Sequence, residues 1–405
     1  MMKFTLNEGQ QNCLNKLIKW WNSYDGSQQV FEIIGEAGTG KTSVIHALIE
    51  NLESLKIDNV LFVAFIGKAA MQMTKSGVRA STIHSAIYNA VEKVKKDKDG
   101  NVILKEGRPV TEIKFVKKVT LDPDIKLIVV DEAAMVDKKV AGDLKDFGLP
   151  IIALGDTRQL PPIYGDSAFL QHPDFELTEI MRQKADSPII KLAHSINTAK
   201  DLRLEPAAYG DKVLIIKKKD FLNLYSKVLL QADVVICGKN STRDELNAYI
   251  RELNFKEKGI PVDNIPEIAV GDKIICRKNN WLLAVDDINL INGLIGTVES
   301  MDLESKTLNF LKIDFKPDFL TTPFEDVKIN LKYFFGSKME KEYIKNSPHD
   351  GELFEFGYAI TCHLAQGSQY EKVIVFCERL GDNAYYRRWL YTAITRASDK
   401  LILVI

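Results

Sequence analysis

Residues 35–42 read Gly-Glu-Ala-Gly-Thr-Gly-Lys-Thr and fit the pattern G-x-x-x-x-G-K-[ST]. The apolar run Val30–Ile34 before them predicts a buried strand, and a helix is expected to begin near Thr42. Glycines allow backbone N–H groups to wrap around phosphate oxygens, and the start of a helix adds the positive end of its dipole. The stretch therefore predicts a phosphate-binding loop, in which Lys41 neutralises phosphates and the Thr42 hydroxyl holds Mg²⁺.

Short apolar runs recur on both sides of this loop and predict further strands, at Val60–Phe65, Leu127–Val130 and Ile151–Leu154. Residues 8–23 carry apolar side chains at helical spacing and predict an amphipathic helix. Strands that alternate with helices predict an α/β fold, with a parallel sheet covered on both faces.

Two carboxylates, Asp131 and Glu132, directly follow the run Leu127–Val130. In a parallel sheet the end of this strand would lie beside the phosphate loop. Asp131 is then expected to support Mg²⁺, and Glu132 to orient and deprotonate the attacking water. Because acidic pairs also follow strands by chance, this interpretation depends on the loop at residues 35–42.

The next strand ends in the polar stretch Gly155–Pro162, which closes with two prolines. Gln159 in this loop is expected to sense the γ-phosphate, although a plain turn explains the pattern equally well. Arg182 and Arg396 are candidates for the cations that meet transition-state charge in phosphoryl transfer. Taken alone, each is better explained as a surface arginine.

The length and the charge of the chain limit the number of domains and the kind of binding surface that it can have. The 405 residues suggest two or three domains, and 54 basic against 55 acidic side chains give a net charge of −1, so a nucleic-acid surface must be local. The sequence contains neither an apolar run long enough for a membrane helix nor a secretory signal. Five dispersed cysteines without a C-x-x-C pair suggest buried thiols in a reducing cytoplasm.

A second α/β region is expected from about Lys184, with strands at Val213–Ile216, Val234–Cys237, Val373–Phe376 and Leu401–Ile405. Residues 271–348 interrupt it with short β-like runs, at Lys273–Cys276, Ile295–Glu299 and Thr307–Phe315, which predict an inserted small barrel.

The stretch Tyr88–Lys118 holds nine Lys or Arg and five Asp or Glu. Its turn signal at residues 98–101 lies between the segments Val91–Lys95 and Val102–Lys105, which predicts a charged hairpin formed by these two segments. A solvated surface loop is an equally good explanation of this stretch.

Taken together, these motifs resemble superfamily 1B DNA helicases of the RecD/Dda type, including the phage Dda-type helicase. The resemblance implies two RecA-like motor domains, 1–183 and 184–405, with a hairpin called 1B inserted at about 86–120 and an SH3-like barrel called 2B at about 271–350. It makes Leu6–Gln10 an adenine-reading motif, with Gln10 as the base contact, and Tyr391–Arg396 the motif that carries an arginine finger.

The resemblance assigns residues to three kinds of site. Catalytic residues would be Lys41, Asp131, Glu132, Gln159, Arg182 and Arg396, with Thr42 and Asp131 as metal ligands. ATP would contact Gln10, Gly35, Ala37, Gly38, Thr39, Gly40, Lys41, Thr42 and Ser43. DNA would contact Gly67, Lys68, Thr82, His84, Asn240, Arg243, Asn292, Thr361 and His363.

Two motifs depart from the family pattern. Phe65 and Ile66 stand where the family usually has Pro and Thr, and Leu364 stands where it usually has a basic residue. Each departure removes one expected contact with the DNA backbone.

The implied activity is ATP-dependent translocation on single-stranded DNA, 5′-to-3′, with unwinding of forked duplex DNA, in roles that include replication, recombination and repair. A monomer in the bacterial or phage-infected cytoplasm is expected, with a single-strand-binding protein as a possible partner. The alternative is a DNA-stimulated ATPase that clamps or remodels without unwinding. A small-molecule kinase with a phosphate loop is a third reading, against which the second α/β region and the motif series argue.

Overall fold

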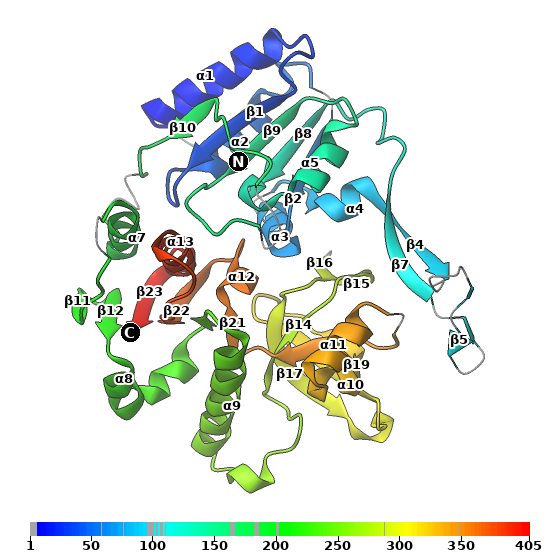
Figure 1. Ribbon diagram of the computed structural model, residues 1–405, viewed down its shortest axis with the longest axis vertical. Helices are drawn as coiled ribbons and strands as arrows, with labels where there is room; N and C mark the ends of the chain where they lie inside the picture. Colours follow the sequence, from blue (N-terminus) through cyan, green and yellow to red (C-terminus); the bar gives the residue numbers. More distant parts are fainter. Residues whose placement is uncertain are drawn as a thin grey trace. The chain divides into compact units, whose positions relative to one another are not determined.

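The computed structural model describes residues 6–57, 59–75, 77–94, 101–102, 104–105, 108–109, 111–162, 167–181, 186–199, 202–286, 288–347 and 349–405. It divides into two compact units, whose helices and strands are labelled in Figure 1. The first unit consists of Met1–Ile87, Lys118–Asn240 and Thr361–Ile405, and the second of Tyr88–Lys117 and Ser241–Ile360. The first sheet described below belongs to the first unit, as does the second sheet apart from Ala359 and Ile360 of its edge strand.

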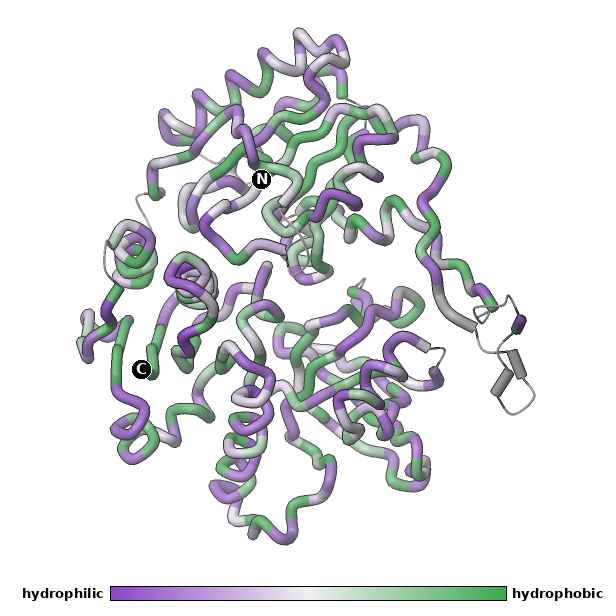
Figure 2. Tube along the Cα trace, viewed as in Figure 1, coloured by the Kyte–Doolittle hydropathy of each residue, from purple (hydrophilic) through white to green (hydrophobic). Residues whose placement is uncertain are grey.

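The first sheet carries the phosphate loop. Its strands are, in spatial order, β10 (Phe175–Leu177), β1 (Val30–Gly35), β9 (Ile151–Gly155), β8 (Leu127–Asp131), β2 (Val60–Ala64) and β3 (Ala80–Thr82), and every adjacent pair is parallel. All residues of β9, and all but the last of β8, are buried, as expected for strands covered on both faces. These central strands appear green, or hydrophobic, in Figure 2. The strands predicted around the loop are confirmed.

Helices and a short 3₁₀ turn accompany this sheet, namely α1 (Glu8–Asn22), α2 (Lys41–Asn51), α3 (Gly67–Lys75), α4 (Ile83–Ile87), η1 (Ala133–Met135) and α5 (Lys138–Lys145). A capping box formed by Asn7 and Gln10 starts α1. The apolar face of α1, with Leu14 and Leu17, packs into one core with Phe31 of β1 and Leu48 of α2. This packing fixes the start of α1, and therefore Gln10, close to the phosphate loop.

The second sheet of the first unit runs in the order β11 (Ala207–Tyr209), β12 (Val213–Ile216), β23 (Ala397–Val404), β22 (Tyr370–Phe376), β13 (Val234–Cys237) and β21 (Ala359–Thr361). The pairs from β12 to β13 are parallel, and β11 is antiparallel to β12. The helical elements here are α7 (Pro188–Thr198), α8 (Lys218–Leu224), η2 (Ser226–Gln231), α12 (Cys362–Ala365) and α13 (Asn383–Ile394). The predicted second α/β region is therefore present.

The second unit contains an antiparallel sheet ordered β19 (Phe324–Asn330), β18 (Phe310–Pro317), β17 (Ile295–Asp302), β14 (Lys273–Cys276) and β20 (Phe354–Phe356). Phe315 contacts Phe324 and Phe354 in its core. The unit also holds the ribbon β15 (Asn280–Val285) with β16 (Ile288–Leu290), and the helical elements α9 (Asn240–Glu257), η3 (Val262–Asn264), η4 (Leu303–Ser305), α10 (Leu331–Phe335) and α11 (Lys338–Lys345).

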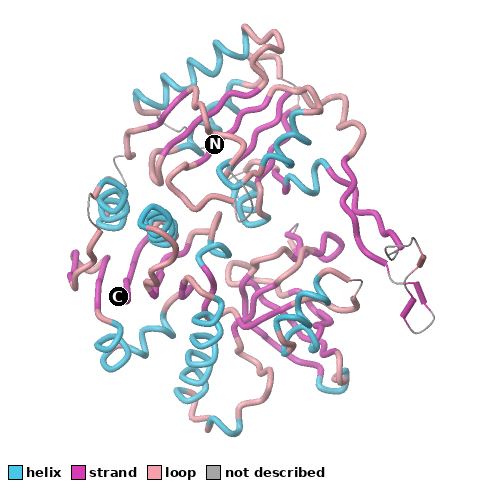
Figure 3. The backbone as a smooth tube through the Cα atoms, viewed as in Figure 1, coloured by secondary structure: helices cyan, strands magenta, loops and turns pink. Residues whose placement is uncertain are grey.

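A hairpin does form within the charged stretch, but its strands pair differently from the prediction. β4 (Tyr88–Val94) pairs with β7 (Thr111–Lys117), from Tyr88 opposite Lys117 to Val94 opposite Thr111 (Figure 3). The segment predicted as the partner contains β5 (Leu104–Lys105), which pairs with β6 (Arg108–Pro109) instead. The longer ladder comes from seven consecutive matched positions that lie farther apart in the chain than the two predicted segments. Residues 98–100 of the predicted turn lie outside the described residues.

The predicted burial of the cysteines is confirmed for four of the five. All five are free, and all except the half-buried Cys377 are fully buried. Burial raises the pKa of Cys13, Cys276 and Cys362 to about 12, so these thiols remain protonated near neutral pH. Among the described residues, no helix combines the length and the apolar composition that crossing a bilayer requires.

A fully buried carboxylate, Asp272, ties together several segments of the second unit. Its oxygens accept from Nε and Nη2 of Arg251 at 2.7 and 2.8 Å, from the Ala269 N–H at 2.8 Å and from the Tyr358 hydroxyl at 2.9 Å. Removing one partner of such a buried pair leaves an uncompensated charge.

We therefore expect Asp272→Ala to destabilise the second unit by about 3–5 kcal/mol. The measurement is the midpoint of denaturant unfolding of the full chain. Glu299→Ala is the matched control, because its carboxylate lies 3.2 Å from Lys316 in an exposed ion pair, which contributes about 1 kcal/mol or less. Equal midpoints for the two variants would contradict the prediction.

Candidate active site

The phosphate loop connects β1 to α2. Gly38 and Gly40 adopt φ values of +88° and +82°, in the left-handed region that favours glycine. At Gly40 a Cβ atom would also lie only 2.1 Å from Nε2 of Gln10. The loop therefore requires glycine at this position both for its backbone conformation and for the close approach of α1. Lys41, Thr42 and Ser43, which are also predicted nucleotide contacts, come directly after the loop and form the first turn of α2.

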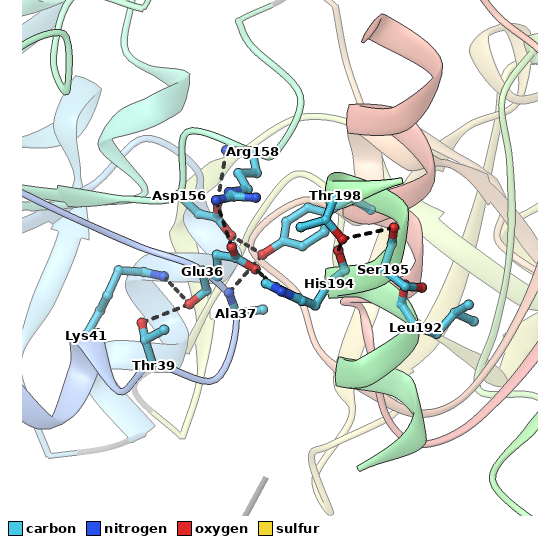
Figure 4. Close-up of polar contacts among 11 residues, drawn as sticks. Glu36, Ala37, Thr39, Lys41, Asp156, Arg158, Leu192, His194, Ser195 and Thr198 are labelled. Atoms are coloured by element: carbon cyan, nitrogen blue, oxygen red, sulfur yellow. Dashed lines mark hydrogen bonds and ion pairs between the residues drawn. The ribbon is translucent and has the colours of Figure 1, made fainter. Parts of the chain in front are cut away.

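Lys41 folds back over its own loop. Its ammonium donates to the carbonyl of Gly35 at 2.6 Å and to that of Glu36 at 3.1 Å (Figure 4). Thr39 also donates from its hydroxyl to the Glu36 carbonyl, at 2.9 Å. Thr42 is exposed and Ser43 is buried. The lysine charge is thus already held at the loop where phosphate oxygens would bind.

Gln10 is 1% exposed and bridges the start of α1 to the loop. Its Nε2 donates to the Thr39 carbonyl at 3.0 Å, and its Oε1 accepts from the Asn7 N–H at 3.0 Å. The predicted base contact is therefore held beside the loop, with both ends of its amide bonded within the protein.

The two carboxylates lie at the end of β8, as the strand pattern predicted. The Glu132 N–H donates to Oδ1 of Asp131 at 2.8 Å, and Glu132 has a φ of +50°, an uncommon conformation for this residue type. Burial raises the pKa of Asp131, against the opposing effects of the Glu132 N–H and the Lys41 charge. Burial, followed by the Asp131 charge, raises the pKa of Glu132, while Arg396 and Lys41 oppose that shift. The structure thus brings Lys41, Asp131, Glu132 and Arg396 into one electrostatic cluster.

The loop after β9 lies next to this cluster. Asp156 is 1% exposed, and its Oδ1 accepts from the Arg158 N–H at 2.9 Å. Gln159 is buried and lines a pocket of about 720 Å³ that Lys138, Lys145 and Arg388 also line. Among the described residues, none of the positions 35–43 lines that pocket. The expected contact of Gln159 with a γ-phosphate remains a prediction.

Arg396 reaches the cluster from the second sheet, between α13 and β23. It is 5% exposed, and its guanidinium donates to the carbonyls of Thr392 and Ser368 at 3.0 and 3.1 Å and to the Thr395 hydroxyl at 3.2 Å. The surface-arginine explanation is therefore wrong for Arg396. Arg182, the other predicted arginine, lies outside the described residues.

A group of polar contacts that the sequence analysis missed surrounds Glu36 of the phosphate loop. Oε1 of Glu36 lies 3.0 Å from Nη2 of Arg158, and Oε2 lies 3.4 Å from Nδ1 of His194 on α7. Figure 4 shows His194 and Arg158 converging on Glu36 from different segments. Glu36 occupies a variable position of the loop pattern, so only its charge could have suggested a partner.

A second missed group links the two sheets through α13. The Tyr391 hydroxyl donates to Oδ2 of Asp156 at 2.6 Å and accepts from the Ala37 N–H at 2.9 Å. The Leu160 N–H donates to the Thr392 hydroxyl at 2.9 Å, and Gln366 donates to the Leu160 carbonyl at 3.1 Å. These residues lie within motifs noted in the sequence, but the motifs alone did not indicate which loops they contact.

The predicted DNA contacts of the first sheet lie after β2 and β3. Gly67 and Lys68 start α3, and Lys68 is only 8% exposed, with its ammonium 3.0 Å from the Tyr370 hydroxyl. Thr82 is buried and accepts from the Ser85 N–H at 3.2 Å. His84 contacts the Phe65 ring edge-on, and burial lowers its pKa.

The other predicted DNA contacts are distributed over both compact units. Asn240, the first residue of α9, is counted with the first unit, whereas the rest of the helix belongs to the second. In the first unit Thr361 is buried, and Nε2 of His363 lies 3.4 Å from the Tyr385 hydroxyl. In the second unit Asn292 is exposed, while Arg243 lies 3.6 Å from the buried carboxylate of Glu355. Their contacts with DNA remain predictions.

Metal binding rests on two predicted ligands. Thr42 and Asp131 come from the start of α2 and the end of β8. In the part of the chain that the structure describes, no group of three or more His, Cys, Asp or Glu side chains is arranged to hold a metal ion. A protein-only metal cage is therefore absent from the described residues.

Known protein families and relatives match both the segment that carries the phosphate loop and the segment that carries Arg396. Residues 5–215 match the AAA domain family, and residues 356–404 match the UvrD-like helicase C-terminal domain. The chain is 25% identical over 419 residues to an ATP-dependent RecD2 DNA helicase of Deinococcus radiodurans, covering 98% of this chain and 48% of that relative. It therefore spans about half the length of this relative.

Two further relatives are Pif1 helicases. The chain is 24% identical over 424 residues to the ATP-dependent DNA helicase Pif1 of Campylobacter jejuni, covering 90% of this chain and 86% of that one. A crystal structure of a Bacteroides Pif1 helicase, in complex with ADP-AlF3 and ssDNA, superposes with a TM-score of 0.55 at 17% identity, covering 99% and 92% of the two chains. The chain belongs to the AAA domain family and is similar to RecD2 and Pif1 helicases.

Proposed function

We propose that this chain is an ATP-dependent DNA helicase that moves 5′-to-3′ on single-stranded DNA and unwinds forked duplexes. One observation carries the proposal: Tyr391 of α13, five residues before the buried Arg396, bonds to Ala37 of the phosphate loop and to Asp156 after β9, which brings this arginine of the second sheet to the loop that holds Lys41. Phosphoryl transfer needs these charges together, because the protein contributes mainly positioning and charge stabilisation. The Bacteroides relative, whose structure contains ADP-AlF3 and ssDNA, supports the same ligands here.

Each predicted catalytic residue has a separate role in the proposed hydrolysis of ATP. The loop N–H groups and Lys41 bind the triphosphate, and Glu132 orients and deprotonates the attacking water. Thr42 and Asp131 would hold Mg²⁺, which supplies charge neutralisation of the phosphates when bound. An exposed hydroxyl and a carboxylate beside Lys41 fit this hard cation, which prefers oxygen ligands. Arg396 and Arg182 complete the charge balance as the transition state forms.

The two parallel sheets would act as motor domains, 1–183 and 184–405, that close on ATP and relax after hydrolysis. Single-stranded DNA would bind Gly67, Lys68, Thr82, His84, Asn240, Arg243, Asn292, Thr361 and His363. The β4–β7 hairpin would serve as the inserted 1B wedge and the antiparallel sheet of the second unit as the SH3-like 2B insertion. Opening a base-pair step costs roughly 1.4 kcal/mol on average, which ATP hydrolysis readily exceeds.

A tail-polarity experiment tests this function. Duplexes that carry only a 5′ or only a 3′ single-stranded tail are incubated with the protein, with and without ATP. We expect ATP-dependent strand displacement with the 5′ tail, none with the 3′ tail or a blunt duplex, and faster hydrolysis when oligo-dT is added. Displacement from the 3′ tail alone would reverse the proposed direction.

Two contacts favour the alternative of a DNA-stimulated clamp or remodeller. Lys68 is paired with Tyr370, and Arg243 with Glu355, so two predicted phosphate contacts already have partners within the protein. Fewer available cations weaken the sequence-independent grip on a nucleic-acid backbone. Hydrolysis that rises with oligo-dT, while neither tailed duplex is displaced, would establish this alternative.

A further inference from the structure

We propose that Tyr391 is a positioning residue that fixes Arg396 for ATP hydrolysis by anchoring α13 to the phosphate loop and to Asp156. The proposal deepens the proposed function, on which it rests. The Tyr391 hydroxyl belongs neither to the phosphate-loop pattern nor to the arginine finger, so neither motif predicts its role.

The hydroxyl of Tyr391 is shared between two loops of the first sheet. It donates to Oδ2 of Asp156 at 2.6 Å and accepts from the Ala37 N–H at 2.9 Å, and the side chain is 1% exposed. Burial, followed by the Asp156 charge, raises the pKa of Tyr391, so its proton remains available to Asp156. A buried hydrogen bond to a carboxylate is stronger and shorter than one between neutral groups.

The residue after Tyr391, Thr392, contacts Arg396 directly. The Thr392 hydroxyl accepts from the Leu160 N–H, and the Thr392 carbonyl accepts from Nε of Arg396 at 3.0 Å. The last turn of α13 is therefore bonded to the loop after β9 on one side and to the arginine on the other. Arg396 is 5% exposed and also donates to the Ser368 carbonyl at 3.1 Å, so its position depends on the last turn of α13 and on the segment around Ser368.

Packing alone does not require this arrangement. A buried hydroxyl needs only one partner to offset its desolvation, yet Tyr391 takes one from each loop that borders the candidate nucleotide site. Ala37 belongs to the phosphate loop itself, so movement of that loop is transmitted to α13. If these bonds were lost, Arg396 would have more freedom while the loop and Lys41 kept their own contacts.

The test is Tyr391→Phe, which removes the hydroxyl and keeps the ring. We measure kcat and KM for ATP with saturating oligo-dT, and affinity for a fluorescent ATP analogue. We expect kcat to fall about 10- to 100-fold, as for the loss of a hydrogen bond to a charged group, with analogue affinity changed less than about threefold. Tyr386→Phe is the matched control, because Tyr386 lies on the same helix and stacks on Trp389, and its kcat should not change.

Double variants separate positioning from general damage. Combined with Arg396→Lys, Tyr391→Phe should add little, because both changes act through one guanidinium. If Tyr391→Phe folds poorly, Thr392→Val removes the Leu160 contact at nearly constant volume and should also lower kcat without adding to Arg396→Lys.

Three results would overturn the proposal: an unchanged kcat in Tyr391→Phe, an effect fully additive with Arg396→Lys, or a loss of analogue affinity as large as the loss of kcat. Failure of the proposed function looks different. If the wild-type protein hydrolyses ATP at a rate that oligo-dT does not change, the helicase assignment fails. The kcat of Tyr391→Phe and of wild type, compared without DNA, then still tests whether Tyr391 positions Arg396. A wild-type protein without any ATP hydrolysis would overturn both.

Discussion

Lys41→Ala is expected to lower kcat for ATP hydrolysis by about 100- to 1,000-fold or more, while the fold stays intact. The ammonium is held at the phosphate loop by the carbonyls of Gly35 and Glu36, and binding of phosphate would exchange these acceptors for anionic ones. Charge that stabilises the transferred phosphoryl group is preorganised in this way, so its removal affects the transition state directly. Steady-state hydrolysis with saturating oligo-dT measures the effect.

Lys19→Ala is the control for Lys41→Ala, because Lys19 is an exposed lysine on α1 of the same unit. It should hydrolyse ATP at the wild-type rate. Circular dichroism melting should give the same transition for both variants and the wild type. Wild-type turnover in Lys41→Ala would remove the assignment of residues 35–42 as the catalytic phosphate loop.

The surroundings of Lys41 were largely predictable from sequence because they are local. An apolar strand, a loop in which glycine is sterically required at Gly40, and a helix follow one another within about twenty residues. The place of Asp131 also followed from a general rule, since the carboxyl ends of parallel strands meet at one edge of a sheet.

Contacts between distant segments were not predictable in the same way. Tyr391 and Asp156 are 235 positions apart, and nothing in either local pattern selects the other as a partner. Glu36 and His194 are 158 positions apart and meet only because α7 folds back toward the phosphate loop. Such pairings depend on the packing of both sheets in one unit, which periodicity and motif spacing do not encode.

The hairpin error has a different cause. The prediction depended on the turn signal at residues 98–101, whereas strand partners are determined by the whole ladder. Thr111–Lys117 offers a longer run of matched positions to Tyr88–Val94 than Val102–Lys105 does. A short-range signal therefore identified the kind of element and missed its pairing.

Arg396→Ala is the second large effect, because an arginine that meets transition-state charge contributes roughly 10³–10⁵ in rate. We expect kcat to fall within that range while a fluorescent ATP analogue still binds. Arg396→Lys should recover only part of the rate, since an ammonium cannot reproduce the planar donor set of a guanidinium. The buried bonds of Arg396 to Thr392 and Ser368 show that the protein supports this side chain from its own sheet.

Arg388→Ala serves as the control for fold and for loss of a cation, because Arg388 is an exposed arginine on the same helix. Its basal hydrolysis without DNA should equal that of the wild type. If Arg396→Ala kept its turnover, the second sheet would contribute no catalytic charge. Closure of the two motor domains would then not be needed for hydrolysis. If it instead lost nucleotide affinity in proportion to rate, Arg396 would bind the ground state, and hydrolysis would depend on charges of the first sheet alone.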